Sequence, residues 1–274
     1  MSESLTARVA AEVAAPGSWD RPVLAASGPI RFARYAYGPN RLGYCGPDEA
    51  AELFEQATAG RGGSEADDHR LRALEGQFEG AYPYLELIAR ANGIADPLDA
   101  SVVEAYWLGS PLAANVRAAD LGPSLEARFR PRLRADAWRW LSTTPAAGSV
   151  PVHAFHVLDV FPKVGLMRTG EIDRALEVMD ACRIRWGRVL EVDGDWLVVA
   201  SVPLELVEGR LRLGEPQPER IRGWLGGTGF VDDLRPGDVV SIHWDWACER
   251  LDRRHLAALR HWTVRELEIA NRTI

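Results

Sequence analysis

Residues 182–199 are CRIRWGRVLEVDGDWLVV and predict two β-strands joined by a tight turn. The Asp-Gly pair at 193–194 lies between two apolar, β-branched runs, which is a strong short-range sign of a hairpin. Residues 236–243, PGDVVSIH, predict a further turn and a strand. Cys182 therefore opens the first strand, and His243 ends a late one. A small barrel could bring these two ends together, and a thiolate with an imidazole is a metal-ligand pair.

This pattern resembles the hydrogenase-formation chaperones (HypC/HupF), small barrel proteins that help to build the iron site of nickel–iron hydrogenases. The resemblance covers residues 182–262. The positions that match the family pattern are Cys182, Gly187, Val189, Gly237, Asp238, Val240 and His243. The resemblance implies that Cys182 and His243 hold an iron carrying cyanide and carbon monoxide ligands, or bind the site cysteine of a client. The implied partner is a hydrogenase large subunit or another maturation protein.

The whole chain predicts an α+β protein with two domains. Apolar residues recur at helical spacing through residues 1–145, which predicts an all-α N-terminal domain with an aromatic core. Within it, Gly38-Pro39-Asn40 predicts a turn. Residues 146–181 predict a linker and a connecting amphipathic helix. Residues 182–274 predict a small OB-like β-barrel with a C-terminal helix that Asp252 caps.

The composition indicates a folded protein and argues against nucleic-acid binding. Hydrophobic residues make up 47% of the 274, and the formal net charge of −7 argues against a nucleic-acid partner held by a basic face. No apolar run approaches the ~18 residues of a membrane helix. The first residues lack the basic and apolar segments of a signal peptide, and three cysteines do not make a disulfide framework. We therefore expect a cytoplasmic protein with no membrane partner.

Further candidate ligands lie outside the predicted barrel. His153 and His156 form His-x-x-His, which puts both rings on one side of a helix but on opposite faces of a strand. Cys45 precedes a predicted helix N-terminus, which would lower the pKa of its thiol. These three residues make the alternative hypothesis, a metal-dependent enzyme with its site at the domain boundary.

Two tryptophans flank the predicted ligand pair. Trp244 and Trp246 lie just after His243, and one could cover a metal while the other packs or is exposed to bind a partner. A plainer alternative stays open for the pair itself, because free cysteine is commonly a buried structural residue. In that case His243 is satisfied in a turn, and the barrel is a protein-binding module without metal.

The main hypothesis is an accessory maturation chaperone for a metalloenzyme, by resemblance a nickel–iron hydrogenase, and not an enzyme. A ligating thiolate needs a depressed pKa, and Arg183 or Arg185 could supply the positive field at Cys182. The cofactor that this hypothesis implies is iron.

Overall fold

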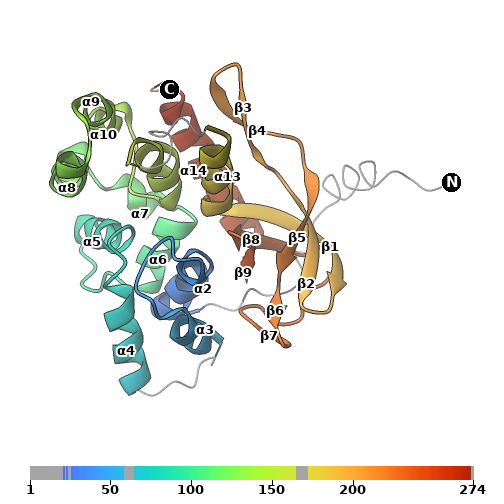
Figure 1. Ribbon diagram of the computed structural model, residues 1–274. Coiled ribbons are helices and arrows are strands. Elements are labelled where there is room, and N and C mark those ends of the chain that lie inside the picture. The colour runs from blue at the N-terminus through green and yellow to red at the C-terminus, as the bar shows by residue number, and fades with distance from the viewer. Residues whose placement is uncertain (1–20, 22, 24–25, 59–64, 165–171, 273–274) are drawn as a thin grey trace.

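The computed structural model describes residues 21, 23, 26–58, 65–164 and 172–272, in which helices come first and a sheet-rich part follows (Figure 1). Several of the helices begin at a residue whose side chain caps the helix. In α2, for example, the Ser27 hydroxyl accepts a hydrogen bond from the Ile30 amide. The helices before the sheet are α2 (Gly28–Arg41), α3 (Ala50–Thr58), α4 (Glu65–Glu75), α5 (Tyr82–Ala91), α6 (Ala100–Trp107), α7 (Pro111–Ala114), α8 (Ala118–Phe129), η2 (Arg130–Arg132), α9 (Ala135–Leu141), α10 (Thr144–Ala147), α11 (His153–Phe155), the π-helix η3 (His156–Val160), α12 (Phe161–Val164) and α13 (Ile172–Cys182).

Five strands form a sheet that closes on itself. The strand order is β1–β2–β5–β9–β8, and β8 pairs again with β1. Neighbouring strands are antiparallel except β5 and β9, which are parallel. The strands are β1 (Arg185–Asp193), β2 (Trp196–Ser201), β5 (Gln217–Arg222), β8 (Val239–His243) and β9 (Trp246–Arg250), with two small hairpins, β3 (Leu204–Val207) with β4 (Arg210–Leu213) and β6 (Trp224–Leu225) with β7 (Thr228–Gly229).

The α+β class and the predicted hairpin are confirmed. Asp193 pairs with Trp196 across the turn, where Gly194 has the positive φ of +57° that this tight connection needs. The closing helix α14 (Arg253–Ala270) is capped by Asp252, whose carboxylate accepts from the His255 amide at 2.7 Å. Residues 1–20 of the predicted helical domain lie outside the described part. Within the described ranges, none of the helices combines the length and the apolarity that a bilayer crossing requires.

The predicted turn at Gly38-Pro39-Asn40 is wrong, because α2 continues through these residues to Arg41. Pro39 falls in the last turns of the helix, and nearly every residue of this segment is buried. The helix is held by packing that the local sequence does not show: Tyr37 meets Trp246 of β9 at a ring-centroid distance of 5.0 Å. Burial of aromatic surface therefore overrides the local turn preference.

Helices and sheet share one hydrophobic core. Its members come from both sides of the predicted boundary at residue 182 and include Trp107 of α6 and Trp246 of β9. Trp107 stacks on Tyr35 of α2 at 5.2 Å, and Phe54 of α3 meets Trp246 at 5.6 Å. Helix α2 thus lies between the other helices and the end of the sheet, and it fixes the relative position of the two parts.

A buried charged network crosses the same interface. The Arg31 guanidinium of α2 contacts Glu249 of β9 at 3.2 Å and Glu104 of α6 at 3.0 Å. The Tyr35 hydroxyl donates to Glu249 at 2.8 Å and lies 2.8 Å from the Ser241 hydroxyl. Each buried charge therefore has an opposite charge and a further hydrogen bond, which is the condition under which such groups are tolerated.

Replacing Gly38 by alanine is expected to cost about 1–3 kcal/mol of the free energy of unfolding. A Cβ at Gly38 would lie 2.8 Å from the backbone oxygen of His243, so α2 and the end of β8 must separate. Urea unfolding checks this, with Gly122→Ala in α8 as the control: a Cβ at Gly122 meets no atom within 4 Å. The control should be unchanged or slightly more stable. Equal stabilities would show that the close approach at Gly38 is not limiting.

Candidate metal centre

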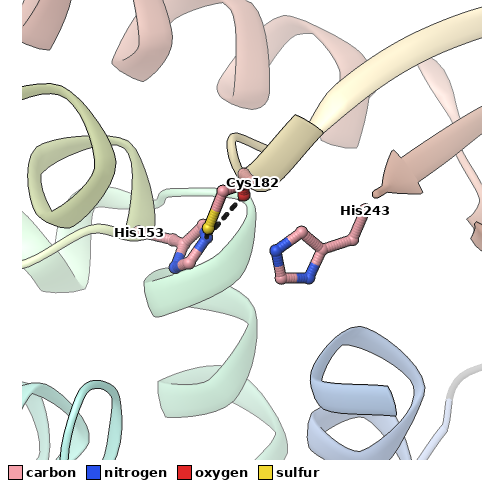
Figure 2. Close-up of side chains that lie close together, drawn as sticks. All are labelled: His153, Cys182 and His243. Carbon is pink, nitrogen blue, oxygen red and sulfur yellow. Dashed lines mark hydrogen bonds between the residues drawn. The ribbon is translucent and has the colours of Figure 1, made fainter. Parts of the chain in front are cut away.

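Three side chains that can bind a metal converge where the helices meet the sheet. They are His153 of α11, Cys182 at the end of α13 and His243 at the end of β8, and their ligand atoms all lie within 4.8 Å of one another. The Cys182 sulfur is 4.0 Å from Nε2 of His153, and Figure 2 shows the His243 ring directed toward the other two side chains. The pair predicted from sequence is therefore brought together, with His153 from the alternative hypothesis as a third member.

Backbone contacts hold the helix end beside the strand end. Cys182 is the last residue of α13, so the prediction that it opens the first strand is wrong: β1 begins at Arg185. The Trp244 amide donates to the Ala181 carbonyl at 2.7 Å, which ties the end of α13 to the turn after β8. Trp244 has a φ of +57°, an uncommon conformation for a bulky residue. This turn is held in a strained conformation next to the candidate ligands.

His243 presents a lone pair to the cluster. Its Nδ1 lies 2.6 Å from the Tyr35 carbonyl oxygen, and since that oxygen can only accept, Nδ1 carries the hydrogen. In the neutral ring Nε2 is then unprotonated, and among the described residues it is buried without a hydrogen-bond partner. The Cys182 carbonyl also lies near this ring, but an acceptor cannot bond a nitrogen that has no hydrogen. Burial, helped by His153, lowers the pKa of His243 well below its usual value, so the ring is neutral.

His153 is held between two oxygens. Its Nε2 is 2.9 Å from the Cys182 carbonyl, and its Nδ1 is 3.1 Å from the Tyr106 hydroxyl. Burial lowers the pKa of His153 to about 4, so this ring is also neutral. To bind an ion through Nε2, the ring moves its hydrogen to Nδ1, which then donates to the Tyr106 hydroxyl. A ligand histidine whose other nitrogen donates to a fixed oxygen is the usual arrangement at metal sites.

Cys182 is a protonated thiol at neutral pH. Burial raises the pKa of the thiol well above its usual value, and nearby Cys45 adds to this, while the Trp244 side chain opposes it weakly. The expectation that neighbouring arginines lower this pKa is wrong, because both are directed elsewhere. Arg183 pairs with Asp180 at 2.8 Å, and Arg185 pairs with Glu219 and donates to the Trp244 carbonyl.

Replacing Tyr106 by phenylalanine is expected to lower metal affinity about 10–100-fold, because the Nδ1 hydrogen of metal-bound His153 then has no acceptor. The control is Tyr84→Phe. Tyr84 is also buried and stacks on Tyr106 at 5.8 Å, but its hydroxyl lies 3.4 Å from His156, outside the cluster. Competition titration against a chelator measures both affinities. If the two variants bind equally well, the Tyr106 hydroxyl does not orient a ligand.

The other predicted ligands lie outside this group. His156 shares a helical stretch with His153, and the rings lie parallel with centroids 6.3 Å apart, but its Nδ1 faces the Tyr84 hydroxyl. Cys45 is exposed as a residue, yet the atoms packed around its thiol raise its pKa to about 12. The expected lowering by a helix N-terminus is wrong, since α3 begins only at Ala50. Within the described residues, Cys45, His153 and His156 do not form a ligand group.

The flanking tryptophans are packed inside the protein. Trp246 is 2% exposed and lies in the main core, 5.5 Å from Phe230. Trp244 is 9% exposed and packs against Tyr44 at 4.2 Å, beside the Cys182 sulfur. Trp107, which the sequence did not single out, meets the His153 ring at 4.7 Å and the His243 ring at 5.6 Å. Aromatic rings therefore screen the cluster from solvent.

Comparison with known proteins places the chain in an uncharacterised family. A family model described as a family of unknown function (DUF6390) matches residues 24–274. No curated protein and no solved structure matches. The match includes the whole stretch 182–262 that resembles the hydrogenase-formation chaperones, so the assignment to that family is wrong.

Proposed function

Because the chain belongs to this family of unknown function, DUF6390, we propose its function from the site alone: the protein binds one transition-metal ion through His153, Cys182 and His243. One observation carries this proposal. Nε2 of His243 is buried with its lone pair directed at a thiol and a second imidazole, and no described group satisfies it. Such a nitrogen is costly to bury unless a ligand uses it.

The donor set suits late transition metals. Thiolate and imidazole are ligands of zinc and copper, and three protein ligands leave a coordination position open. Metal–ligand bonds of about 2.0–2.3 Å put the ligand atoms roughly 3.3–3.8 Å apart. The three atoms lie within 4.8 Å of one another, so small side-chain movements of about 1 Å would bring them to bonding distance of one ion.

The sheet supports this geometry if it is an OB-like barrel, which we infer from its connections. Strands β1, β2 and β5 form a meander, and β8 and β9 complete the ring, with β9 parallel to β5 and β8 beside β1. Five strands in a Greek-key ring are the mark of that fold. His243 ends β8, so it stands at one end of the ring, where α13 delivers Cys182.

The burial of the two histidine ligands favours an ion that stays bound over one that is quickly transferred. His243 is 1% exposed and His153 is 5% exposed. A role as an assembly factor for a metalloenzyme, with iron as the ion, calls for release to a client, whereas a resident ion suits a metal-dependent enzyme or a stabilised fold. Challenge of the loaded protein with a chelator separates these roles: we expect slow release, and release within seconds would favour delivery.

Metal binding itself is tested by loading the full chain under nitrogen with zinc(II), iron(II), cobalt(II) or copper(I) in separate samples. After gel filtration at least one ion should remain at one per chain. Because the ligands come from three separate segments, the ion should also raise the melting temperature. A thousandfold excess over Kd contributes about 4 kcal/mol, which is roughly 8–16 °C for a chain of this size. If every ion stays substoichiometric, the proposed function is wrong.

The affinity is expected to rise about tenfold per pH unit between roughly pH 5 and pH 8. The pKa of Cys182 is raised by burial, so across this range the ion must displace the thiol hydrogen, and protons compete with it. His153, with a pKa of about 4, and His243 are already neutral and add no further slope. Competition titrations at several pH values measure the slope. An affinity independent of pH would mean that no thiolate binds the ion.

A further inference from the structure

Carboxylates beside Cys182 and His243 are paired with arginines, and this bears on which ion fits. Two arginines follow Cys182 in sequence, and each pairs with one carboxylate: Arg183 with Asp180, and Arg185 with Glu219. On the other side of His243, the buried Glu249 contacts Arg31, which also contacts Glu104, and Glu104 in turn contacts Arg254. Each of these carboxylates therefore already has a guanidinium partner, which leaves it less available to balance the charge of a bound ion.

The ligands themselves supply one negative charge. A metal-bound cysteine is a thiolate and a metal-bound histidine is a neutral imidazole. A monovalent ion with His153, Cys182 and His243 is then neutral, whereas a divalent ion with the same ligands carries a net charge of +1. Burying an uncompensated charge costs free energy here, because His153 and His243 are almost fully buried and water is largely excluded from them.

The number of donors points the same way. Three ligand atoms converge. The Trp107 ring packs against both imidazoles, with ring centroids 4.7 Å from His153 and 5.6 Å from His243. Zinc in proteins takes four ligands, so here it needs an added water or hydroxide. Soft thiolate ligands suit copper(I) as well as zinc, but a trigonal set of two histidines and one cysteine is typical of copper.

We propose that the ion of this site is copper(I), held by Cys182, His153 and His243 as a neutral three-coordinate complex. This rests on the proposed function, since it names the ion for that same site. On binding, the copper–sulfur bond forms and the S–H bond breaks, so one proton leaves to solvent for each ion. A divalent ion reaches neutrality only with a hydroxide as fourth ligand, and it then releases two protons, one from the thiol and one from water.

The first test counts protons on the wild-type chain. Titration with copper(I) or with zinc sulfate in weakly buffered solution under nitrogen gives the protons released per ion bound. We expect one proton for copper(I), and we expect equimolar copper(I) to displace any zinc. Zinc binding at one per chain with two protons released, and resistance to equimolar copper(I), would overturn the inference while leaving the proposed function intact. If neither ion binds at one per chain, the proposed function itself fails.

The second test compares two variants of equal side-chain length that differ by one negative charge in the ligand set. His153→Glu adds one negative charge, and His153→Gln is its neutral control of the same length. Affinities for copper(I) and zinc are measured for both variants by chelator competition. The ratio of copper(I) to zinc affinity should be at least about tenfold lower in the glutamate variant, because the divalent complex is now the neutral one. Equal ratios in the two variants would show that charge balance does not select the ion.

Discussion

Serine in place of Cys182 is expected to lower metal affinity by more than about a hundredfold. This loss exceeds the roughly 10–100-fold loss expected when a residue that only orients a ligand is removed. The sulfur is the only anionic and soft donor of the three ligand atoms. Its loss leaves two neutral imidazoles and a hydroxyl that keeps its hydrogen at neutral pH. The metal content measured by elemental analysis after gel filtration should fall from one ion per chain to background. Circular dichroism should confirm that the variant is folded.

The matched control for this change is Cys45→Ser. Cys45 is the exposed cysteine and lies outside the ligand group, so this variant should still bind one ion per chain. Retention of one ion per chain with unchanged affinity in the Cys182 variant would show that the sulfur is not a ligand. Loss of the ion in both variants would mean that Cys45 takes part in binding.

Methionine in place of Arg31 is expected to cost about 3–5 kcal/mol of the free energy of unfolding, measured in urea. Arg31 is the guanidinium that faces Glu249 at 3.2 Å, and the Glu249 side chain is 4% exposed. Without Arg31 this carboxylate stays buried and loses its direct ion pair; the Tyr35 hydroxyl still donates to it, and Arg34 of α2 remains as a nearby positive charge. Removing one partner of a buried pair costs more than the pair itself contributes.

The double variant Arg31→Met with Glu249→Gln separates the lost charge from the lost packing. Glutamine is neutral and can still accept from the Tyr35 hydroxyl, so most of the lost stability should return. If the double variant is as unstable as the single one, the cost comes from packing at Arg31. If the single variant loses less than about 1 kcal/mol, the network does not hold helices and sheet together.

Much of the fold could be predicted because its signals are local. The Asp-Gly turn at 193–194 and the cap at Asp252 depend on a few neighbouring residues, and both are present. The turn expected at Gly38-Pro39-Asn40 failed because the decisive contact is distant: Tyr37 packs against Trp246, 209 positions later, inside a shared core. A local pattern cannot report burial that the rest of the chain provides.

The resemblance to the hydrogenase-formation chaperones failed for a physical reason as well. Several matching residues serve the closed sheet. A Cβ at Gly187 would lie 3.0 Å from Val199 and Ile242, Gly237 has a φ of +93°, and the Asp238 carboxylate accepts from the Arg235 amide at 3.0 Å. Any closed sheet with a tight turn and a close approach between neighbouring strands favours glycine and aspartate at such positions. The motif therefore reports the shape of the sheet and not descent.

The site could be predicted in part. The nearness of Cys182 and His243 followed from strand ends meeting at one rim, although Cys182 proves to end a helix. His153 was identified as a possible ligand but assigned to another site, because nothing in its sequence spacing shows that α11 packs beside the end of α13. The Tyr35 backbone carbonyl and the Tyr106 hydroxyl orient the two imidazoles, and no sequence motif marks either role.

X-ray absorption at the edge of the bound metal tests the central claim most directly. On the wild-type chain loaded with one ion, the first shell should contain one sulfur and two imidazole nitrogens, the set that His153, Cys182 and His243 provide. A first shell without sulfur, or one made of oxygen atoms and a single nitrogen, would contradict it.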